Sequence, residues 1–86
     1  MTMPEATAYV VLIGDHPTAV ATDLATAQAA ALADETRYSA ADQYETKWDS
    51  YSPTEWRLMS RRKDRGGRYA WTRRSIRTAP LATPAT

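Results

Sequence analysis

The sequence predicts a small α+β domain in which an antiparallel β-sheet carries one helix on one face, in the element order β-β-α-β-β-β. Three observations predict this class. Residues 8–13 form an apolar run rich in β-branched side chains, residues 24–38 are dominated by Ala, Leu, Gln and Glu, and residues 44–49 alternate between aromatic or Thr side chains and charged ones. Strand patterns on both sides of one helical segment are typical of a single sheet packed against a single helix.

Length and composition limit the chain to one domain. Its 86 residues, 43% apolar and 24% charged, have room for one hydrophobic core and the composition of an ordinary globular protein. We expect one domain over residues 8–77, between a flexible N-terminus at 1–7 and a disordered Pro/Ala/Thr tail at 78–86. No apolar run is long enough to span a membrane and no basic signal region begins the chain, so we expect a cytoplasmic protein.

The apolar run 8–13 ends at Gly14 and predicts the central strand of the sheet. A turn at residues 15–17 leads into a weaker strand at 18–21, close enough along the chain to form a hairpin with the first. The run is apolar on both faces of its strand, whereas a single helix covers only one face. We therefore expect a homodimer packed sheet to sheet; the alternative is a monomer whose own C-terminal strand or residues 39–43 close the second face.

The helix predicted at 24–38 begins after Thr22 and Asp23, which supply an N-cap and an acidic first turn. Its many alanines would let it lie close against a sheet. Asp34, Glu35 and Arg37 are expected on its solvated side or at the margin of that side. As neighbours on a helix, Asp34 and Glu35 diverge by about 100°, which makes them unsuitable as a catalytic carboxylate pair. One stripe of the helix carries its apolar contacts: Leu24, Ala27, Ala31, Leu32 and Tyr38.

The second half of the chain predicts three strands. The alternating strand at 44–49 is interrupted by residues 50–54, which include a proline. Two further strands are expected at 56–61 and 68–76, around a loop at 62–67 whose two glycines can adopt the positive φ of a tight turn. These last two strands would form a basic hairpin.

A register with Leu58 opposite Trp71 and Ser60 opposite Tyr69 separates apolar from charged side chains in this hairpin, whereas a one-residue slip mixes them. Trp56 then joins the apolar face, so both tryptophans of the hairpin are expected in the core. The opposite face would carry the other side chains of the two strands: Arg57, Met59, Arg61, Arg68 and Thr72.

Charge is distributed unevenly along the chain, although the net charge is only +1. Residues 1–50 carry two basic and eight acidic side chains, whereas residues 51–86 carry nine basic and two acidic ones. Such asymmetry between halves indicates a charged partner more than it indicates a fold. All nine basic residues of the second half lie within 21 positions, interleaved with aromatic residues: Arg57, Arg61, Arg62, Lys63, Arg65, Arg68, Arg73, Arg74 and Arg77.

The residue types of most catalytic and metal sites are missing. The chain has no cysteine and a single histidine, His16, whose neighbour Asp15 shares a proline-containing turn that is typical of a solvated loop. Gly66 and Gly67 lack the sequence context of a phosphate-binding loop. We therefore expect no catalytic residue, no metal site and no cofactor, and the sequence predicts a protein that is not an enzyme.

The basic hairpin at 57–77 has the chemistry of nucleic-acid binding. Arginine forks match phosphate oxygens and base edges, a two-stranded ribbon fits the major groove, and aromatic rings stack on unpaired bases. We expect a small binding or regulatory protein, a bacterial or phage accessory protein, that contacts DNA or RNA through this hairpin. The first phosphate contacts are expected from five residues: Arg61, Arg62, Lys63, Arg65 and Arg68.

Two alternatives use the same features differently. The chain could be a protein–protein interaction module, such as an inhibitor or adaptor encoded by a phage or mobile element. It would use the basic hairpin against an acidic surface, or the acidic helix face around Asp34 and Glu35 against a basic one. The hairpin could also be a charged edge that serves only solubility. Overall charge does not separate these alternatives.

Overall fold

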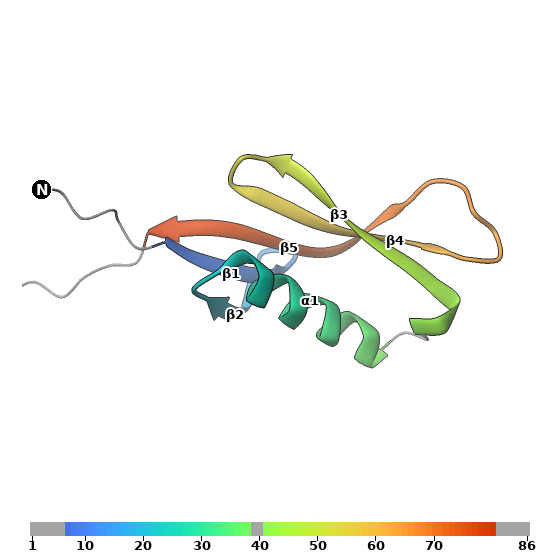
Figure 1. The fold of residues 1–86 in the computed structure, drawn as a ribbon, viewed down its shortest axis with the longest axis horizontal. Helices are drawn as coiled ribbons and strands as arrows, with labels where there is room; N and C mark the ends of the chain where they lie inside the picture. Colours follow the sequence, from blue (N-terminus) through green and yellow to red (C-terminus); the bar gives the residue numbers. More distant parts are fainter. Residues whose placement is uncertain (1–6, 39–40, 81–86) are drawn as a thin grey trace, which may run out of the picture.

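The computed structural model describes residues 7–38 and 41–80, and it confirms the predicted order of one helix after two strands and before three (Figure 1). A short 3₁₀ turn, η1, precedes the third strand. The elements are β1 (Thr7–Ile13), β2 (His16–Ala21), α1 (Leu24–Tyr38), η1 (Ala41–Gln43), β3 (Tyr44–Ser52), β4 (Glu55–Arg62) and β5 (Ala70–Pro80).

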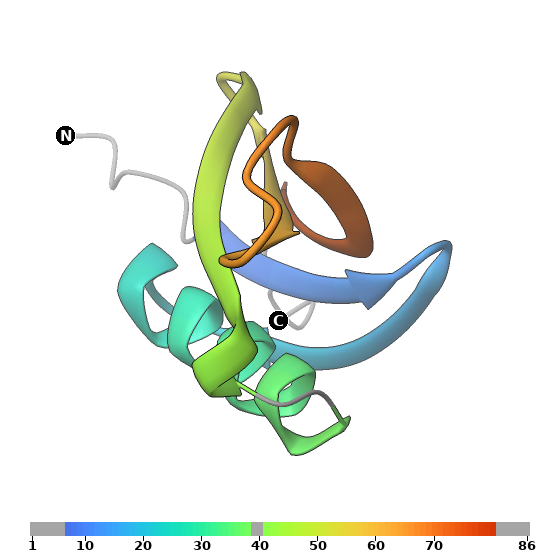
Figure 2. The same cartoon turned by 90° about the vertical axis from the view of Figure 1, so that its right-hand side faces the viewer.

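The five strands form one antiparallel sheet in the order β2-β1-β5-β4-β3. The middle strand is therefore β5, and the prediction that the run 8–13 is central was wrong. The physical reason is length: β5 has 11 residues, enough to pair with β1 along its C-terminal part and with β4 along most of its length. The sheet is strongly twisted, so that β3 crosses the direction of β1 and β2 when viewed end on (Figure 2).

Strand boundaries differ from the expected ones mainly at the ends. β5 continues to Pro80, which pairs with Thr7, so residues 78–80 of the predicted tail and the last residue of the predicted N-terminal segment belong to the sheet. The other residues predicted as flexible or disordered ends lie outside the described residues. β3 also continues through Ser52, and the turn that interrupts it is confined to residues 53–54.

Helix α1 lies on one side of the sheet (Figure 1). Its start is fixed by Asp23, whose carboxylate accepts hydrogen bonds from the Thr26 backbone N–H at 2.8 Å and from the Thr26 hydroxyl at 2.9 Å. Ala27 and Ala31 are completely buried, because small side chains allow the helix to approach the strands closely. With Val11 of β1 and Ile76 of β5 they form the core, against which larger side chains pack: Tyr9, Ala21, Leu24, Trp48 and Trp56.

The register of the basic hairpin is one residue away from the predicted one. Met59, not Leu58, lies opposite Trp71, and Ser60 lies opposite Ala70. Directly opposed residues of antiparallel strands point to the same face of the sheet. Trp71 therefore shares the face of Arg57 and Met59 instead of entering the core beside Leu58.

A bulge in β5 makes the register irregular. Arg57 pairs with Ser75 and Met59 pairs with Trp71, so the three residues 72–74 oppose Leu58 alone. The Thr72 hydroxyl donates to the Leu58 carbonyl oxygen at 2.8 Å, and the Gly14 N–H donates to the carbonyl oxygen of Arg73 at 2.8 Å. Arg73 adopts a φ of 72°, a left-handed conformation that costs a residue with a Cβ about 1–2 kcal/mol.

Two ends of the molecule differ in character (Figure 1). At one end β1 begins and β5 finishes, paired with each other. At the other end the loop 63–69 between β4 and β5 extends beyond the helix. Within the described residues, no helix has the length and apolar character needed to cross a membrane.

Candidate functional site

Five of the nine predicted site residues are engaged in ion pairs within the chain. Because each guanidinium already faces a carboxylate, these residues contribute little net charge to a ligand surface. The pairs are Arg57 and Arg77 with Glu55 (2.9 and 3.2 Å), Arg61 with Glu45 (2.5 Å), Arg62 with Asp64 (3.2 Å), and Arg74 with Asp34 (2.9 Å) and Glu35.

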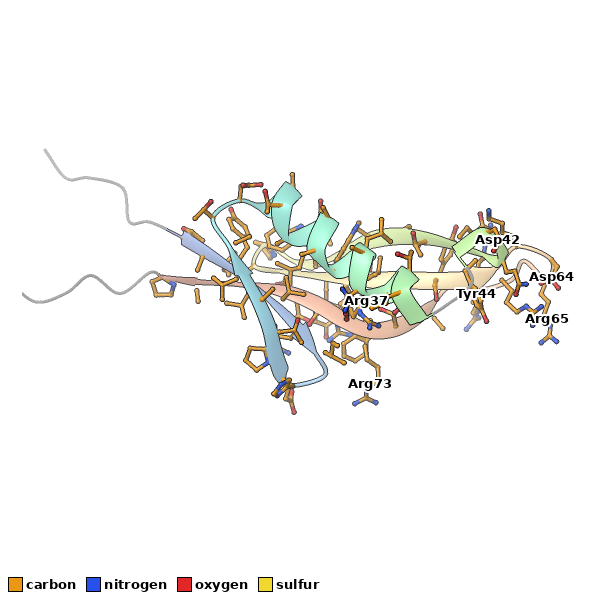
Figure 3. All side chains as sticks on the ribbon, turned by 90° about the horizontal axis from the view of Figure 1, so that it is seen from below. Arg37, Asp42, Tyr44, Asp64, Arg65 and Arg73 are labelled. Atoms are coloured by element: carbon orange, nitrogen blue, oxygen red, sulfur yellow. The ribbon has the colours of Figure 1, made fainter. Side chains whose placement is uncertain are left out.

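The other four predicted cations form no ion pair within residues 7–38 and 41–80. They are all exposed. Lys63, Arg65 and Arg68 lie on the loop between β4 and β5, and Arg73 lies on the bulge. In Figure 3, Arg65 extends from the loop and Arg73 from the sheet toward the same side of the molecule.

Backbone hydrogen bonds hold the loop at its β4 end. The Lys63 N–H donates to the Gln43 carbonyl oxygen at 2.9 Å, which ties the end of β4 to η1, and the Gly66 N–H donates to the Arg62 carbonyl oxygen at 3.1 Å. Gly66 and Gly67 both have positive φ, 61° and 80°, so the predicted role of the two glycines is confirmed. The loop therefore presents its cations from a supported turn.

The sheet face turned away from α1 carries arginine and lysine side chains stacked on aromatic rings. The Arg57 guanidinium lies 3.7 Å from the centre of the Tyr51 ring and 4.6 Å from that of Trp71. We call the following seven residues the stacked face: Lys47, Tyr51, Arg57, Arg61, Tyr69, Trp71 and Arg73. Lys47 and Arg61 lie 4.6 and 4.5 Å from the Tyr69 ring centre, and Arg73 lies 6.0 Å from that of Trp71.

Two carboxylates favour the charged forms of Arg57 and Arg61 on this face. The Glu55 carboxylate accepts a hydrogen bond from Arg57 and raises the pKa of that guanidinium above its ordinary value. Glu45 raises the pKa of Arg61 in the same way. A guanidinium on an aromatic ring combines a positive charge with a flat surface, and both match the components of a nucleotide.

Asp34 and Glu35 lie at the margin of the solvated helix side, since their side chains are 30% and 18% exposed. Both carboxylates contact Arg74 of β5, whose side chain is only 11% exposed. Neighbouring residues on a helix diverge, but the guanidinium has donors on several sides and reaches both carboxylates. This cluster attaches α1 to the sheet, and it leaves neither acid free to form the proposed acidic docking face.

The remaining candidate residues are exposed or lie among mixed charges. His16 is exposed at the start of β2, next to Asp15 in the turn. A shallow depression of about 290 Å³ near η1 is lined by mixed charges: Asp42, Gln43, Arg62, Lys63 and Asp64. The described residues contain no group of three or more His, Cys, Asp or Glu side chains that could hold a metal ion.

Sequence reasoning missed four members of the candidate surface: Lys47, Tyr51, Tyr69 and Trp71. A signal for the first two was present, because odd-numbered positions of β3 share one face, which also carries Glu45 and Asp49. Trp71 was missed because the register next to the β4–β5 loop differs by one residue from the predicted one, and the alternation within a single strand does not set that register.

Comparisons with known proteins add no relative to these observations. No protein-family model matches the chain, and neither the curated proteins nor the solved structures contain a significant match to it.

Proposed function

We propose that this protein is a non-enzymatic nucleic-acid-binding protein that contacts phosphates through the β4–β5 hairpin. The observation that carries the proposal is the division of the nine basic residues into two groups. Five are paired with acids of the same chain, and four remain exposed without an ion pair among the described residues. The four are Lys63, Arg65, Arg68 and Arg73.

The exposed group has the properties of a phosphate-binding surface. Exposed, unpaired cations on a projecting loop gain little for folding, since surface charges contribute about 0–1 kcal/mol at most. Each cation that neutralises a phosphate releases counterions, which makes binding favourable at low salt. Arg61 and Arg62, which the sequence placed among the first contacts, already have acidic partners, so the main contacts move to the loop and the bulge.

A protein with an acidic surface is the alternative ligand for the same exposed basic residues. The second form of that alternative, an acidic helix face, loses support because Asp34 and Glu35 contact Arg74. The expected homodimer stays a prediction. The reason to expect it is weaker than the sequence indicated, because Ala8 and Leu12 on the second face are already buried in the single chain and need no partner copy to cover them. Light scattering separates a mass near 9.6 kDa from twice that value.

Fluorescence anisotropy with labelled DNA and RNA, at about 50 and 200 mM salt, tests the proposal. The parent protein should bind at low salt and lose affinity steeply as salt rises. Replacing Lys63, Arg65 and Arg68 with alanine should weaken binding and reduce the slope of log affinity against log salt by about two to three, since each phosphate contact contributes about 0.7–0.9. The fold should be unaffected, because these side chains are exposed.

The matched control changes net charge by the same amount at a distant place. Ala25→Glu, Ala30→Glu and Thr36→Glu together introduce three negative charges at exposed positions of α1. If this control loses as much affinity as the loop variant, only overall charge matters and the loop is not the contact surface. If the parent binds no nucleic acid even at low salt, the proposed function is wrong.

A further inference from the structure

We propose that the stacked face binds single-stranded nucleic acid in preference to duplex, with Tyr51 as a stacking surface for a base and Arg73 as a direct contact. The inference rests on the proposed function and specifies the class of nucleic acid. It is carried by two independent observations: the ring and cation stacks on β3, β4 and β5, and the conformation of Arg73.

The bulge needs the backbone of residue 73 but not an arginine. Its carbonyl oxygen accepts the Gly14 N–H, and its φ of 72° is the conformation that glycine adopts without steric cost. Contact with Trp71 does not explain an arginine there, because 6.0 Å is at the outer limit of a cation–π interaction. A strained residue with an exposed side chain is a candidate for ligand contact, since a backbone outlier that does not serve stability indicates function.

Tyr51 is the aromatic ring of the face most open to a ligand. It is 59% exposed, and Val20 is the only other large hydrophobic side chain exposed to this degree among the described residues. The Arg57 guanidinium at 3.7 Å supports one part of the ring. A planar ring that is held on one side and open to solvent is the arrangement on which an unpaired base stacks.

The rings and cations of the stacked face form a row along the sheet, which an extended single strand could follow. From the loop toward Tyr51, the face presents the exposed loop cations, then Tyr69 with Lys47 and Arg61, then Trp71 with Arg73 and Arg57. On β4, Arg57 and Arg61 point to this face four residues apart, a separation of about 13 Å along the strand, with Met59 between them.

The same face is poorly suited to duplex. Glu45 and Glu55 lie beside Arg61 and Arg57, so part of the positive charge is compensated where a duplex would place one negative charge every 1.7 Å or so of its axis. Bases inside a duplex also present no free ring surface to Tyr51. A single strand gains stacking that a duplex does not, and it needs fewer phosphate contacts.

Anisotropy titrations with an oligothymidylate, an oligouridylate and a duplex of equal length test the inference. We expect the single strands to bind about tenfold or more tightly than the duplex at the same salt. Tyr51→Ala should weaken single-strand binding about five- to tenfold, in the lower part of the range for loss of one base stack, and change duplex binding less than twofold. The two single strands show whether deoxyribose or ribose is preferred.

Arg73→Gly gives a second readout that a purely structural role would not produce. Relief of the left-handed conformation should leave the melting temperature equal or higher, while single-strand affinity falls. Val20→Ala, an equally exposed apolar position on β2, is the matched control for Tyr51→Ala and should leave binding unchanged.

The outcomes separate this inference from the proposed function. Equal affinity for duplex and single strand, or unchanged single-strand affinity in both Tyr51→Ala and Arg73→Gly, overturns the inference; loss of binding in the loop variant would then still support the proposed function. Absence of binding to all three probes at low salt overturns both.

Discussion

The two faces of the sheet are closed in different ways. On the face toward α1, aliphatic and aromatic side chains pack on two alanines that are completely buried. On the opposite face, no helix is present among the described residues, and arginine side chains lie over aromatic rings instead. Ser75 is nevertheless completely buried on that face, which shows that the stacked side chains exclude water from part of the sheet.

The difference shows what a small chain can do with a second sheet face. A helix seals its face by removing apolar area from water, and the sealed surface cannot contact a ligand. Long arginine side chains also cover apolar surface with their methylene groups, but their charged ends remain at the surface. One face therefore serves stability, while the other combines partial burial with groups that can bind an anion.

Ile76→Ala on the covered face is expected to have the largest effect on stability. Ile76 is completely buried between β1, β4 and the alanines of α1, so its truncation leaves a cavity and should lower the free energy of unfolding by about 2–5 kcal/mol. Urea unfolding measures the change. Val20→Ala, 63% exposed, is the control and should change stability by about 0.5 kcal/mol or less.

Trp71→Ala on the stacked face should lower the free energy of unfolding by about 1–2 kcal/mol, less than Ile76→Ala. The substitution removes the ring beneath Arg57 and the hydrogen bond from the indole N–H to the Arg74 carbonyl oxygen at 3.0 Å. It also admits water to the Ser75 hydroxyl, which is buried and has no hydrogen-bond partner among the described residues, and this offsets part of the loss.

Trp71→Phe sharpens the same measurement, since it retains a ring and removes only the hydrogen bond. Trp71→Phe should lower the free energy of unfolding by less than Trp71→Ala does. A loss for Trp71→Ala as large as that for Ile76→Ala would contradict the comparison, because it would make the stacked face a second core.

Replacement of Asp23 is expected to have the smallest effect on stability, and this effect depends on pH. The Thr26 backbone N–H, and then the Thr26 hydroxyl, hold the pKa of this carboxyl below its ordinary value of 3.8. The pKa of Asp23 is lower in the folded protein than in the unfolded chain. The carboxylate therefore makes its full contribution to stability above the unfolded pKa, and this contribution is lost as the pH falls through the folded pKa. Asp23→Ala should lower the melting temperature by a few degrees at pH 7, and the difference should shrink below about pH 4.

Asp23→Asn is the matched variant, since it keeps an oxygen acceptor without a titrating charge. At pH 7 the melting temperature of Asp23→Asn should differ from that of the parent by less than the melting temperature of Asp23→Ala does. At low pH this difference should approach zero. If Asp23→Ala shows the same difference from the parent at pH 7 and at pH 2.5, the cap does not act through the charged carboxylate.

Much of the fold could be predicted from local patterns. The helix 24–38 was confirmed residue for residue, because an alanine-rich segment after an Asp cap favours helix without any tertiary contact. The glycine loop was confirmed for a similar reason, since positive φ is a property of the residue itself. The expectation that both hairpin tryptophans enter the core was half right: Trp56 packs against it, and Trp71 does not.

By itself, the sequence determined the element order, the helix and its cap, and the concentration of basic residues in one hairpin. The tertiary structure alone decided which of those basic residues are neutralised, because Arg61 meets Glu45 and Arg74 meets Asp34 and Glu35 across long separations in the chain. It also decided the face of Trp71, since Met59 and not Leu58 lies opposite it on β4. Alternation within a strand predicts two faces, but the contents of each face depend on the register with neighbouring strands, and only the complete sheet sets that register.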